Sequence, residues 1–417
     1  MTQTKKKVLI IVENLPVPFD GRVWKEALAL REHGYEVTVL CPRGKGYTKL
    51  HEILEGVHIY RHPMPGEGNS PLGYLWEYGC ALFWEFLFSW WIFLARGFDI
   101  IQGCNPPDDI FLVALPFKLF GVRYIFDHHD AIPELYLSKY ERRDLLYKVQ
   151  TRLERLTYRS SSVVIATNES YKALAISRGG LNPEDVFVVR NGPDLSTFRL
   201  VDAQPALKYG KTYLVGYVGT MSIQEGLDIL IEVAANIRSR GRRDVHFTCV
   251  GGGPSLPALR RMLTERELGG IFNFTGRVPD KELLDVLSTA DVCVNPDRPC
   301  EMNDISTMIK IAEYMALGKP VVQFNLKEGR FTAEDASLYS DGEDLVHDFA
   351  DKILWLLDNP EERQRMGAFG RKRVEEHLAW EHSVGNLISA YERAFDKRMR
   401  VSQGSRDTET SFDSAAE

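Results

Sequence analysis

The sequence has little cysteine and no excess of basic residues. Its 417 residues include only six cysteines, and no two of them form a CxxC pair. This argues against a zinc ribbon and a disulfide-rich scaffold, and favours reduced thiols. Lys and Arg number 51 against 58 Asp and Glu, which gives a formal net charge of −7. A nucleic-acid-binding protein is expected to carry a basic surface, so this balance argues against that class.

Long hydrophobic runs are also scarce. The apolar run from Val8 to Val12 is too short for the core of a signal peptide. The richest apolar stretch is 72–98, and its densest part is Phe86 to Ala95. A bilayer span needs about 20 residues. Two interpretations therefore remain open: a buried helix leading into a strand at Ile100, or an aromatic surface that touches the membrane interface or a lipid acceptor.

Short apolar segments alternate with helical patterns along the chain, which predicts parallel sheets with crossover helices. A helix is predicted over 22–33, with Gly34 where a C-cap glycine belongs. The polar stretch 191–211 is the predicted linker. The predicted strands cover 7–13, 36–41, 100–103, 123–127, 163–167 and 186–189 in the first half, and 214–218, 245–250, 271–275, 292–295 and 321–324 in the second.

This pattern predicts an α/β protein with two doubly wound, Rossmann-like domains. Ligands of such sheets bind outside the carboxyl ends of the strands, so we expect the site in a cleft that both domains face. The first domain is expected over residues 1–200 and the second over 201–380. A C-terminal helix, 381–400, is expected to pack on the first domain. Residues 401–417 are rich in Ser, Thr and acidic residues and are expected to be disordered.

The most informative motif of the second half lies in 291–324. Asp304, Ser306 and Thr307 are suitable N-caps for a helix predicted to begin near Ser306. The free N–H groups and positive dipole end of such a helix suit a diphosphate. Lys310 and Glu313 are three residues apart and share a helix face. They suit a phosphate and a pair of ribose hydroxyls; the alternative is an ordinary surface pair.

Three further loops of the second half follow predicted strands. Gly251 and Gly252 follow one strand, and their small size would let a ligand approach the backbone; a plain tight turn is the alternative. Gly219 and Thr220 follow another strand, and Arg277 with Val278 follows a third.

Polar residues also follow two predicted strands of the first half. Gly21 and Arg22 stand between the first strand and its helix, where a phosphate or sugar could meet the helix N-terminus. His128, His129 and Asp130 end another strand, with Glu134 nearby. These groups suit hydrogen bonds to sugar hydroxyls, while a structural role for one histidine is the alternative. His and Asp can also bind metals, but no further ligand spacing supports a metal site.

Seven stretches together carry a resemblance. Residues 7 to about 395 resemble the family-4 retaining glycosyltransferases of the GT-B fold, in particular bacterial members that build surface polysaccharides and lipid-linked glycans. The stretches are ENLPVPFDGRVWKEALALREHGYEV (13–37), DIIQGCNPPD (99–108), FDHHDAIPELY (126–136), VVRNGPDLSTF (188–198), VGGGP (250–254), FTGRVP (274–279) and STMIKIAEYMALGKPVVQF (306–324).

The resemblance implies roles for individual residues. Glu313 matches the second Glu of the family's E-x7-E motif, which binds the donor ribose. His129 and Asp130 match the family's His-Asp on the donor-sugar side. Gly219 and the glycines at 251–253 line the nucleotide site, and Arg277 and Val278 lie where the base is read.

The sequence also departs from this family. Position 305, where the first Glu of the motif would fall, is Ile305, next to Asp304. Thr220 and Glu225 stand where family members commonly carry Arg and Lys. We therefore expect Lys310, with the helix amides and a contribution from Arg22 or Arg298, to hold the pyrophosphate.

The resulting expectation is a metal-independent, retaining glycosyltransferase that uses a nucleotide-diphosphate sugar, with UDP as the first choice of base, and no cofactor. His129, Asp130 and Lys310 are its expected catalytic residues, and His128 and Glu134 are acceptor candidates. The acceptor is a glycan or a polyprenyl-diphosphate-linked sugar. The expected location is cytoplasmic, with peripheral membrane contact through 72–98. A nucleotide-sugar epimerase and a non-catalytic nucleotide-sugar-binding subunit are the alternatives.

Overall fold

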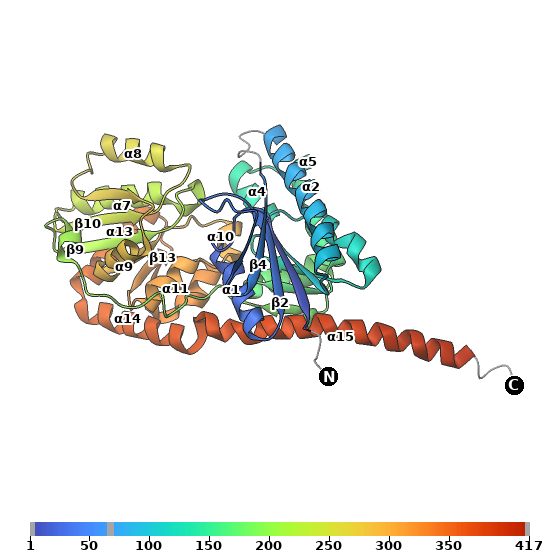
Figure 1. Ribbon diagram of the computed structural model, residues 1–417. Coiled ribbons are helices and arrows are strands. Elements are labelled where there is room, and N and C mark those ends of the chain that lie inside the picture. Colours follow the sequence, from blue (N-terminus) through green and yellow to red (C-terminus); the bar gives the residue numbers. More distant parts are fainter. Residues whose placement is uncertain (1–4, 65–70, 413–417) are drawn as a thin grey trace. The chain divides into compact units, whose positions relative to one another are not determined.

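The computed structural model describes residues 5–64 and 71–412 (Figure 1). The chain divides into two compact units. Unit 1 comprises the chain up to Leu137, Arg142–Val189 and the part from Val384 onward; unit 2 comprises Ser138–Glu141 and Arg190–Ser383. Each unit is built on one largely parallel sheet flanked by helices. This confirms the expected α/β fold with two Rossmann-like halves.

The sheet of unit 1 has the strand order β3-β4-β2-β1-β5-β6-β7-β8, and only β3 is antiparallel to its neighbour. The strands of this sheet are almost entirely buried from β4 to β7 in this order, as strands covered by helices on both sides must be. They are β1 (Lys7–Val12), β2 (Glu36–Pro42), β3 (His51–Leu54), β4 (Val57–His62), β5 (Ile100–Cys104), β6 (Arg123–His128), β7 (Val163–Ala166) and β8 (Val186–Val188).

The helices of unit 1 follow from this strand order. The chain moves from β1 toward β2 in one direction and from β5 toward β8 in the other. Right-handed crossovers therefore place α1 on one face and α2, α3 and α5 on the other. The helices are α1 (Gly21–Glu32), α2 (Pro71–Ala95), α3 (Phe111–Ala114), η1 (Leu115–Phe120), α4 (Ile132–Tyr140), α5 (Leu145–Ser160), α6 (Glu169–Gly179), η2 (Pro183–Asp185) and α15 (Trp380–Phe412).

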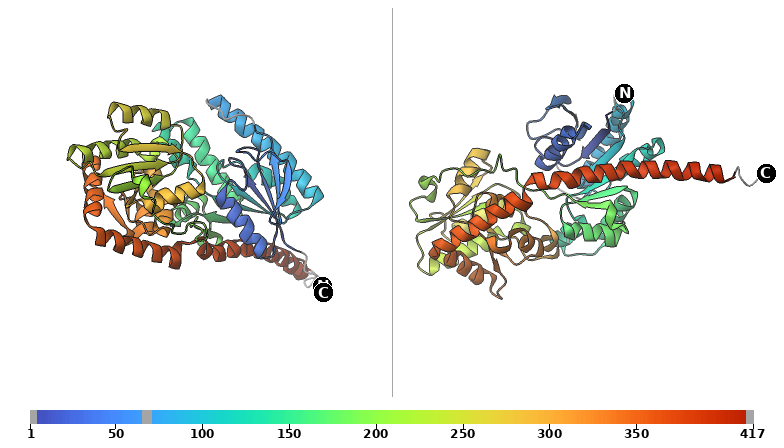
Figure 2. Two further views of the ribbon diagram at one scale, coloured as in Figure 1. Left: turned by 60° about the vertical axis from the view of Figure 1, so that its left-hand side comes forward. Right: turned by 90° about the horizontal axis from the view of Figure 1, so that it is seen from below.

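The C-terminal helix α15 completes unit 1. Figure 2 shows it running along this sheet. Its Tyr391 is fully buried and donates a hydrogen bond to Gln102 on β5. The Tyr391 ring also meets Tyr35 edge-on at a centroid distance of 5.6 Å, and Arg393 pairs with Asp185 at 2.9 Å.

Unit 2 has a fully parallel sheet in the order β11-β10-β9-β12-β13-β14. An apolar cluster joins the sheet to helices α7 (Leu227–Ser239) and α13 (Leu345–Asp358) and includes Phe247, Phe272, Phe324 and Phe349. The strands are β9 (Tyr213–Val218), β10 (Val245–Val250), β11 (Phe272–Gly276), β12 (Val292–Asn295), β13 (Val321–Phe324) and β14 (Ser337–Ser340).

The helices of unit 2 alternate with these strands. They are η3 (Pro205–Lys208), η4 (Ile223–Glu225), α7 (Leu227–Ser239), α8 (Leu256–Glu265), α9 (Asp280–Thr289), α10 (Glu301–Ile305), α11 (Ile309–Ala316), α12 (Lys327–Ala333), η5 (Glu334–Ala336), α13 (Leu345–Asp358), α14 (Pro360–Arg373) and the π-helical turn η6 (Val374–Leu378).

The structure differs from the predicted organisation at the boundary and the tail. Unit 2 begins at Arg190 and not at 201, because Leu195 and Phe198 of the predicted linker pack against an apolar cluster of unit 2. Residues 401–412 are helical, as the end of α15, where disorder was expected; no proline interrupts the helix that enters this stretch. The other five residues of the expected disordered tail lie outside the described residues.

Helix α2 is buried along one narrow stripe only. Ala81, Glu85, Ser89 and Ile92 are buried, and their spacing places them on one face. Trp76, Trp91 and Leu94 are 67%, 52% and 80% exposed. Within the described chain, one helix is long and apolar enough to cross a membrane by length and composition: Trp76–Ala95, with 22% of its apolar window buried. The buried-helix interpretation of 72–98 therefore fits only this stripe.

The glycine loop after β10 generates a stability prediction. Gly251 has φ +124°, and an added Cβ would lie 2.0 Å from the carbonyl oxygen of Gly219. We expect Gly251→Ala to lower the free energy of unfolding by about 1–3 kcal/mol or more, from the backbone conformation alone. Urea unfolding measures this loss. Gly252→Ala is the matched control, because nothing lies within 4 Å of its added Cβ; equal losses in both variants would contradict the prediction.

Candidate functional site

In unit 1, the start of α1 positions the first group of predicted site residues. Asp20 caps the helix: its side chain accepts hydrogen bonds from the backbone N of Arg22 at 3.1 Å and of Val23 at 3.0 Å. Helix α1 therefore begins at Gly21, as the Asp-Gly-Arg motif predicts. This cap fixes the direction in which Arg22 leaves the helix.

Arg22 is buried, with 5% of its side chain exposed, and forms the centre of an ionic network. Its Nη2 lies 2.9 Å from Asp127 Oδ1 and 3.0 Å from Glu26 Oε1. Its Nη1 donates to the carbonyl oxygen of Val189 at 2.9 Å, and its Nε lies 3.0 Å from His129 Nε2. One guanidinium thus joins α1, the end of β6 and the last residue of the central part of unit 1.

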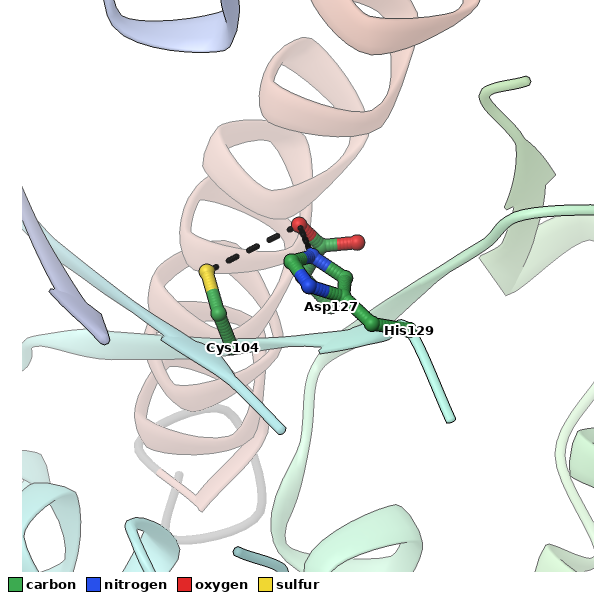
Figure 3. Close-up of side chains that lie close together, drawn as sticks. All are labelled: Cys104, Asp127 and His129. Carbon is green, nitrogen blue, oxygen red and sulfur yellow. Dashed lines mark hydrogen bonds and ion pairs between the residues drawn. The ribbon is translucent and has the colours of Figure 1, made fainter. Parts of the chain in front are cut away.

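Asp127 and His129 form the second half of this network. His129 Nε2 lies 2.7 Å from Asp127 Oδ2 (Figure 3). Burial opposes ionisation of Asp127, but Arg22 and His129 hold its pKa well below the usual range. Burial likewise opposes protonation of His129, but the Asp127 carboxylate raises the His129 pKa. His129 is therefore held by a charged partner, with 15% of its side chain exposed.

The same network contains residues that the sequence did not single out. Gln102 on β5 donates to Asp127 Oδ2 at 3.0 Å and to Glu26 Oε2 at 2.7 Å. Burial raises the pKa of Glu26 to about 8, against the opposing charge of Arg22. The glutamate lies four residues after Arg22 on α1, and this helical spacing is a signal for the pairing.

Cys104, Asp127 and His129 bring three possible metal-binding atoms within 4.8 Å of one another (Figure 3). The set fits a metal poorly. Arg22 already supplies a positive charge to Asp127 and His129. Burial and Asp127 raise the pKa of the Cys104 thiol well above its usual value, which disfavours the thiolate that metals bind.

The two predicted acceptor residues are engaged in the packing of unit 1. His128 is buried, stacks on Tyr171 at 4.5 Å and lies 3.1 Å from the Tyr158 hydroxyl. Burial lowers the pKa of His128 to about 3, so it is a neutral core histidine. Glu134 pairs with Arg178, which also contacts Glu154 at 3.1 Å. These contacts argue against the acceptor role that we expected for His128 and Glu134.

Asp130, the other predicted catalytic residue of unit 1, is held through its backbone. Asn105, on the loop after β5, donates to the Asp130 carbonyl oxygen at 2.7 Å and accepts from its N–H at 3.2 Å. Asn105 also accepts from the N–H of His129 at 2.6 Å. One buried asparagine thus orients both members of the His-Asp motif.

In unit 2, the glycine loops pack against each other. Gly251 approaches Gly219, and an added Cβ at Gly253 would lie 2.6 Å from the Met221 carbonyl oxygen. The Met221 N–H donates to the Gly252 carbonyl at 3.0 Å, and Thr220, beside it, accepts from the Tyr217 hydroxyl through its carbonyl oxygen. The loop after β10 therefore needs glycine so that the loop after β9 can lie against it. This supports the alternative of a plain tight turn.

The predicted helix start near Ser306 is wrong. A short helix, α10, ends at Ile305, and α11 begins at Ile309 with Met308 as a cap that makes no side-chain hydrogen bond. Ser306 instead donates to the carbonyl oxygen of Met302, and Asp304 accepts from the N–H of Lys327 at 2.8 Å. The sequence showed three suitable capping residues, but it did not show that a separate short helix, α10, would precede α11.

Lys310 lies in α11 and is committed to two carboxylates. Its Nζ lies 2.5 Å from Glu225 Oε2 and 2.9 Å from Asp297 Oδ1. The ammonium also lies 4.9 Å from the centre of the Tyr217 ring. Burial opposes both charges, but Lys310 lowers the pKa of Glu225, and the two carboxylates raise that of Lys310. Glu225 thus already pairs with the Lys310 ammonium group, which we expected to hold a pyrophosphate.

Asp297 belongs to this group, although the sequence did not single it out. Burial raises its pKa to about 7, against the effect of Lys310. Its Oδ2 has no hydrogen-bond partner within the part of the chain that the structure describes. Arg298, the other expected phosphate cation of unit 2, pairs with Asp228.

The remaining predicted residues of unit 2 are Glu313, Arg277 and Val278. Glu313 is half-buried on α11. Arg277 is exposed and Val278 half-buried in the loop after β11. Their expected contacts to a ribose and a base stay predictions.

Comparison with known families places these two units. Residues 22–192 match the family model described as glycosyl transferase 4-like domain, and residues 212–359 match the model described as glycosyl transferases group 1. Together the two models match well over half of the chain, one in each sheet-containing half. The chain belongs to the GT-B glycosyltransferases. The resemblance seen in the sequence is thereby confirmed at this level.

Individual relatives agree with this assignment. Alpha-D-kanosaminyltransferase of Streptomyces kanamyceticus is 30% identical over 37% of this chain and 38% of its own length. D-inositol 3-phosphate glycosyltransferase of Thermomonospora curvata is 28% identical over 58% of this chain and 59% of its own length. The chain thus aligns with less than two thirds of either relative.

Solved structures share the fold. Sucrose-phosphate synthase from Thermosynechococcus elongatus superposes with a TM-score of 0.76 at 18% identity, over 94% of this chain and 100% of that one. Anabaena HepE in complex with UDP-glucose has a TM-score of 0.69 at 17% identity, over 93% and 99% of the two chains. These likenesses confirm the GT-B fold.

The ionic network of unit 1 generates a second prediction. Arg22→Met leaves Asp127 and Glu26 buried without their cation, so we expect the free energy of unfolding to fall by about 3–5 kcal/mol. Chemical denaturation measures it. Arg31→Met on the same helix is the control: Arg31 pairs with the exposed Glu32 and Glu55, and exposed pairs contribute about 0–1 kcal/mol. Similar losses in the two variants would refute the central role of Arg22.

Proposed function

We propose that this protein transfers a sugar, with retention at the anomeric carbon, from a nucleoside-diphosphate sugar to a glycan or lipid-linked acceptor in cell-surface polysaccharide synthesis. The observation that carries the proposal is the match of a glycosyltransferase family model in each half of the chain. UDP is the proposed nucleotide, supported by the shared fold with HepE in complex with UDP-glucose. We also propose that the reaction needs no metal and no cofactor.

Unit 1 contributes a rigid, charged group to this reaction. Arg22, Asp127 and His129 are fixed by mutual contacts of 2.7–3.0 Å, so they need little reorganisation when charge develops. In the proposed reaction His129 meets the donor sugar, and Asp130 next to it is the second contact. Arg22 and Asp127 are positioning residues that hold the imidazole.

Unit 2 contributes the proposed nucleotide site around α11. The leaving diphosphate gains negative charge as the sugar departs, and helix N–H groups and a cation stabilise it. The departing phosphate can then take the proton of the acceptor hydroxyl on the same face, so no protein nucleophile is required. Lys310 can contact the diphosphate only if it gives up part of its contact with Glu225 and Asp297.

One observation favours a second candidate function. Lys310 is neutralised by Glu225 and Asp297, which supports the alternative of a subunit that binds a nucleotide sugar without turning it over. A nucleotide-sugar epimerase is the other alternative. Release of UDP that requires an acceptor supports the transferase. Donor binding without release supports the non-catalytic subunit, and an isomerised donor without acceptor supports the epimerase.

The contact between Glu225 and Lys310 sharpens the test of donor binding. Glu225→Gln removes a competing charge, and a charge-assisted hydrogen bond is worth about 1.5–3 kcal/mol. We therefore expect UDP to bind about tenfold more tightly to this variant, as measured by calorimetry. Glu232→Gln, which changes an exposed partner of Arg266 in the same unit, is the control. Unchanged or weaker UDP binding in Glu225→Gln would exclude Lys310 from the diphosphate site.

We further propose a cytoplasmic location with peripheral contact to the membrane through α2. The outer side of this helix exposes Trp76, Phe83, Trp91 and Leu94. Aromatic and aliphatic side chains in this arrangement suit the boundary between lipid headgroups and acyl chains. Helix η1 adds an exposed Leu119 at 88%.

Liposome flotation tests this contact. Burying an exposed aliphatic or aromatic side chain contributes about 1.5–3 kcal/mol. We therefore expect the double variant Trp91→Ser, Leu94→Ser to lose at least about tenfold in liposome binding. Leu200→Ser, at a 60% exposed position in unit 2, is the control. If the double variant floats like the unchanged protein, α2 is not the contact surface.

A further inference from the structure

A second polar cluster lies at the carboxyl edge of the unit 1 sheet, separate from the Arg22 network. Its members come from four elements that are distant in the sequence. Glu13 directly follows β1, His62 is the last residue of β4, Glu85 lies in α2, and Asp109 stands just before α3. Glu13 begins one of the stretches that carry the resemblance, but neither the residue roles that the resemblance implies nor the proposed reaction uses any of the four.

Three members of the cluster are buried, Asp109 is half-buried, and no hydrogen bond joins the four. Glu13, His62 and Glu85 have at most 1% of their surface exposed. Both carboxylate oxygens of Glu13, both of Glu85, Asp109 Oδ1 and His62 Nε2 have no hydrogen-bond partner within the described residues. His62 Nε2 points toward Glu85, 3.9 Å from its Oε1. Buried polar groups without hydrogen bonds are costly, so this number of them in one place calls for a partner.

The cluster also lacks a cation. Burial, followed by the charges of Glu85 and Asp109, raises the pKa of Glu13 to about 11. Burial and Asp109 raise that of Glu85 well above its usual value, and burial raises that of Asp109 to about 6. His62 stays neutral, because burial lowers its pKa to about 4. No Lys or Arg side chain among the described residues forms an ion pair with these three carboxyls, whereas Asp127 and Glu26 share Arg22.

The position in the fold points to a ligand. The strand order reverses between β1 and β5, and ligands of open α/β sheets bind outside the strand ends at such a reversal. Glu13 follows β1, and Asp109 lies in the connection after β5. The cluster is thus at the reversal, on the α2 side of the sheet.

The geometry fits an ammonium group better than a metal ion. The only set of three or more possible metal-binding atoms that converges within 4.8 Å in the described chain is Cys104, Asp127 and His129. A hydroxyl group offers one donor to the unpaired carboxyl oxygens and no charge. An ammonium group supplies three hydrogen-bond donors and a positive charge together.

We propose that Glu13, Glu85 and Asp109 bind an ammonium group of the acceptor, so that the acceptor is an amino sugar or an aminocyclitol. This inference rests on the proposed function, because it names the acceptor class of that reaction. His62 is a positioning residue that holds Glu85 from the strand side. Since burial keeps Glu13 and Glu85 protonated, binding of the ammonium ion releases protons from them to solvent.

Calorimetry on the full chain tests the proposal with matched probes. The probes are D-glucosamine, D-glucose and N-acetyl-D-glucosamine, which differ only at carbon 2, and 2-deoxystreptamine with myo-inositol. We expect at least one amine to bind at least tenfold more tightly than its neutral counterparts. Repeating the titration in buffers of different ionisation enthalpy should show proton release. Absence of any preference for an amine would overturn the proposal.

Two variants locate the site. Glu85→Gln and Glu13→Gln each keep the side-chain shape, and we expect either one to reduce amine binding at least tenfold while UDP binding is unchanged. Glu32→Gln, an exposed change on α1, is the control. Amine binding that persists in both cluster variants overturns the assignment. Binding of Mg²⁺, Mn²⁺ or Zn²⁺ alone that is lost in Glu85→Gln would overturn it in favour of a metal site.

The readouts separate this inference from the proposed function. Amine selectivity with no binding of any nucleotide or nucleotide sugar would contradict the transferase and leave the ammonium site standing. Nucleotide binding and transfer to neutral acceptors only would contradict the ammonium site and leave the transferase standing.

Discussion

The charge balance around Arg22 is the interaction on which the first half of the molecule depends. One buried guanidinium is shared by Asp127, Glu26 and the imidazole of His129. A buried charge is tolerated only when it is paired and hydrogen-bonded, so these residues constrain each other's position. The contact with the Val189 carbonyl oxygen extends the constraint to the last residue of the central segment of unit 1. The His-Asp motif therefore lies on a rigid support.

Unit 2 also pairs a buried cation with carboxyl groups, but the pKa values of those carboxyls differ from those in unit 1. There the cation is Lys310, and two carboxylates surround it. In unit 1 the Arg22 network keeps Asp127 ionised, whereas in unit 2 burial raises the pKa of Asp297 to about 7. The charge of the Lys310 group thus changes near neutral pH through Asp297. A negatively charged ligand at the proposed nucleotide site would therefore meet a group that can take up a proton at Asp297, which would lower the repulsion from the carboxylates.

The sequence predicted what depends on local pattern and missed what depends on distant partners. Buried parallel strands such as 292–295 and 321–324 were predicted to the residue, because continuous apolar runs between turn signals mark them. The hairpin of β3 and β4 was missed because β3 is half exposed and polar. The dipeptide Glu55-Gly56, with φ +46° and +81°, was its available signal. The role of Lys310 could not be predicted, since Glu225 and Asp297 approach it from 85 and 13 residues away.

The closing of unit 1 by α15 has a consequence for how the protein is made. Tyr391 donates a hydrogen bond to Gln102, and Gln102 in turn donates to Asp127 and Glu26. The helix that supplies Tyr391 follows unit 2 in the chain. During synthesis the first sheet therefore lacks the contact between Gln102 and Tyr391 until the whole of the second half has been translated.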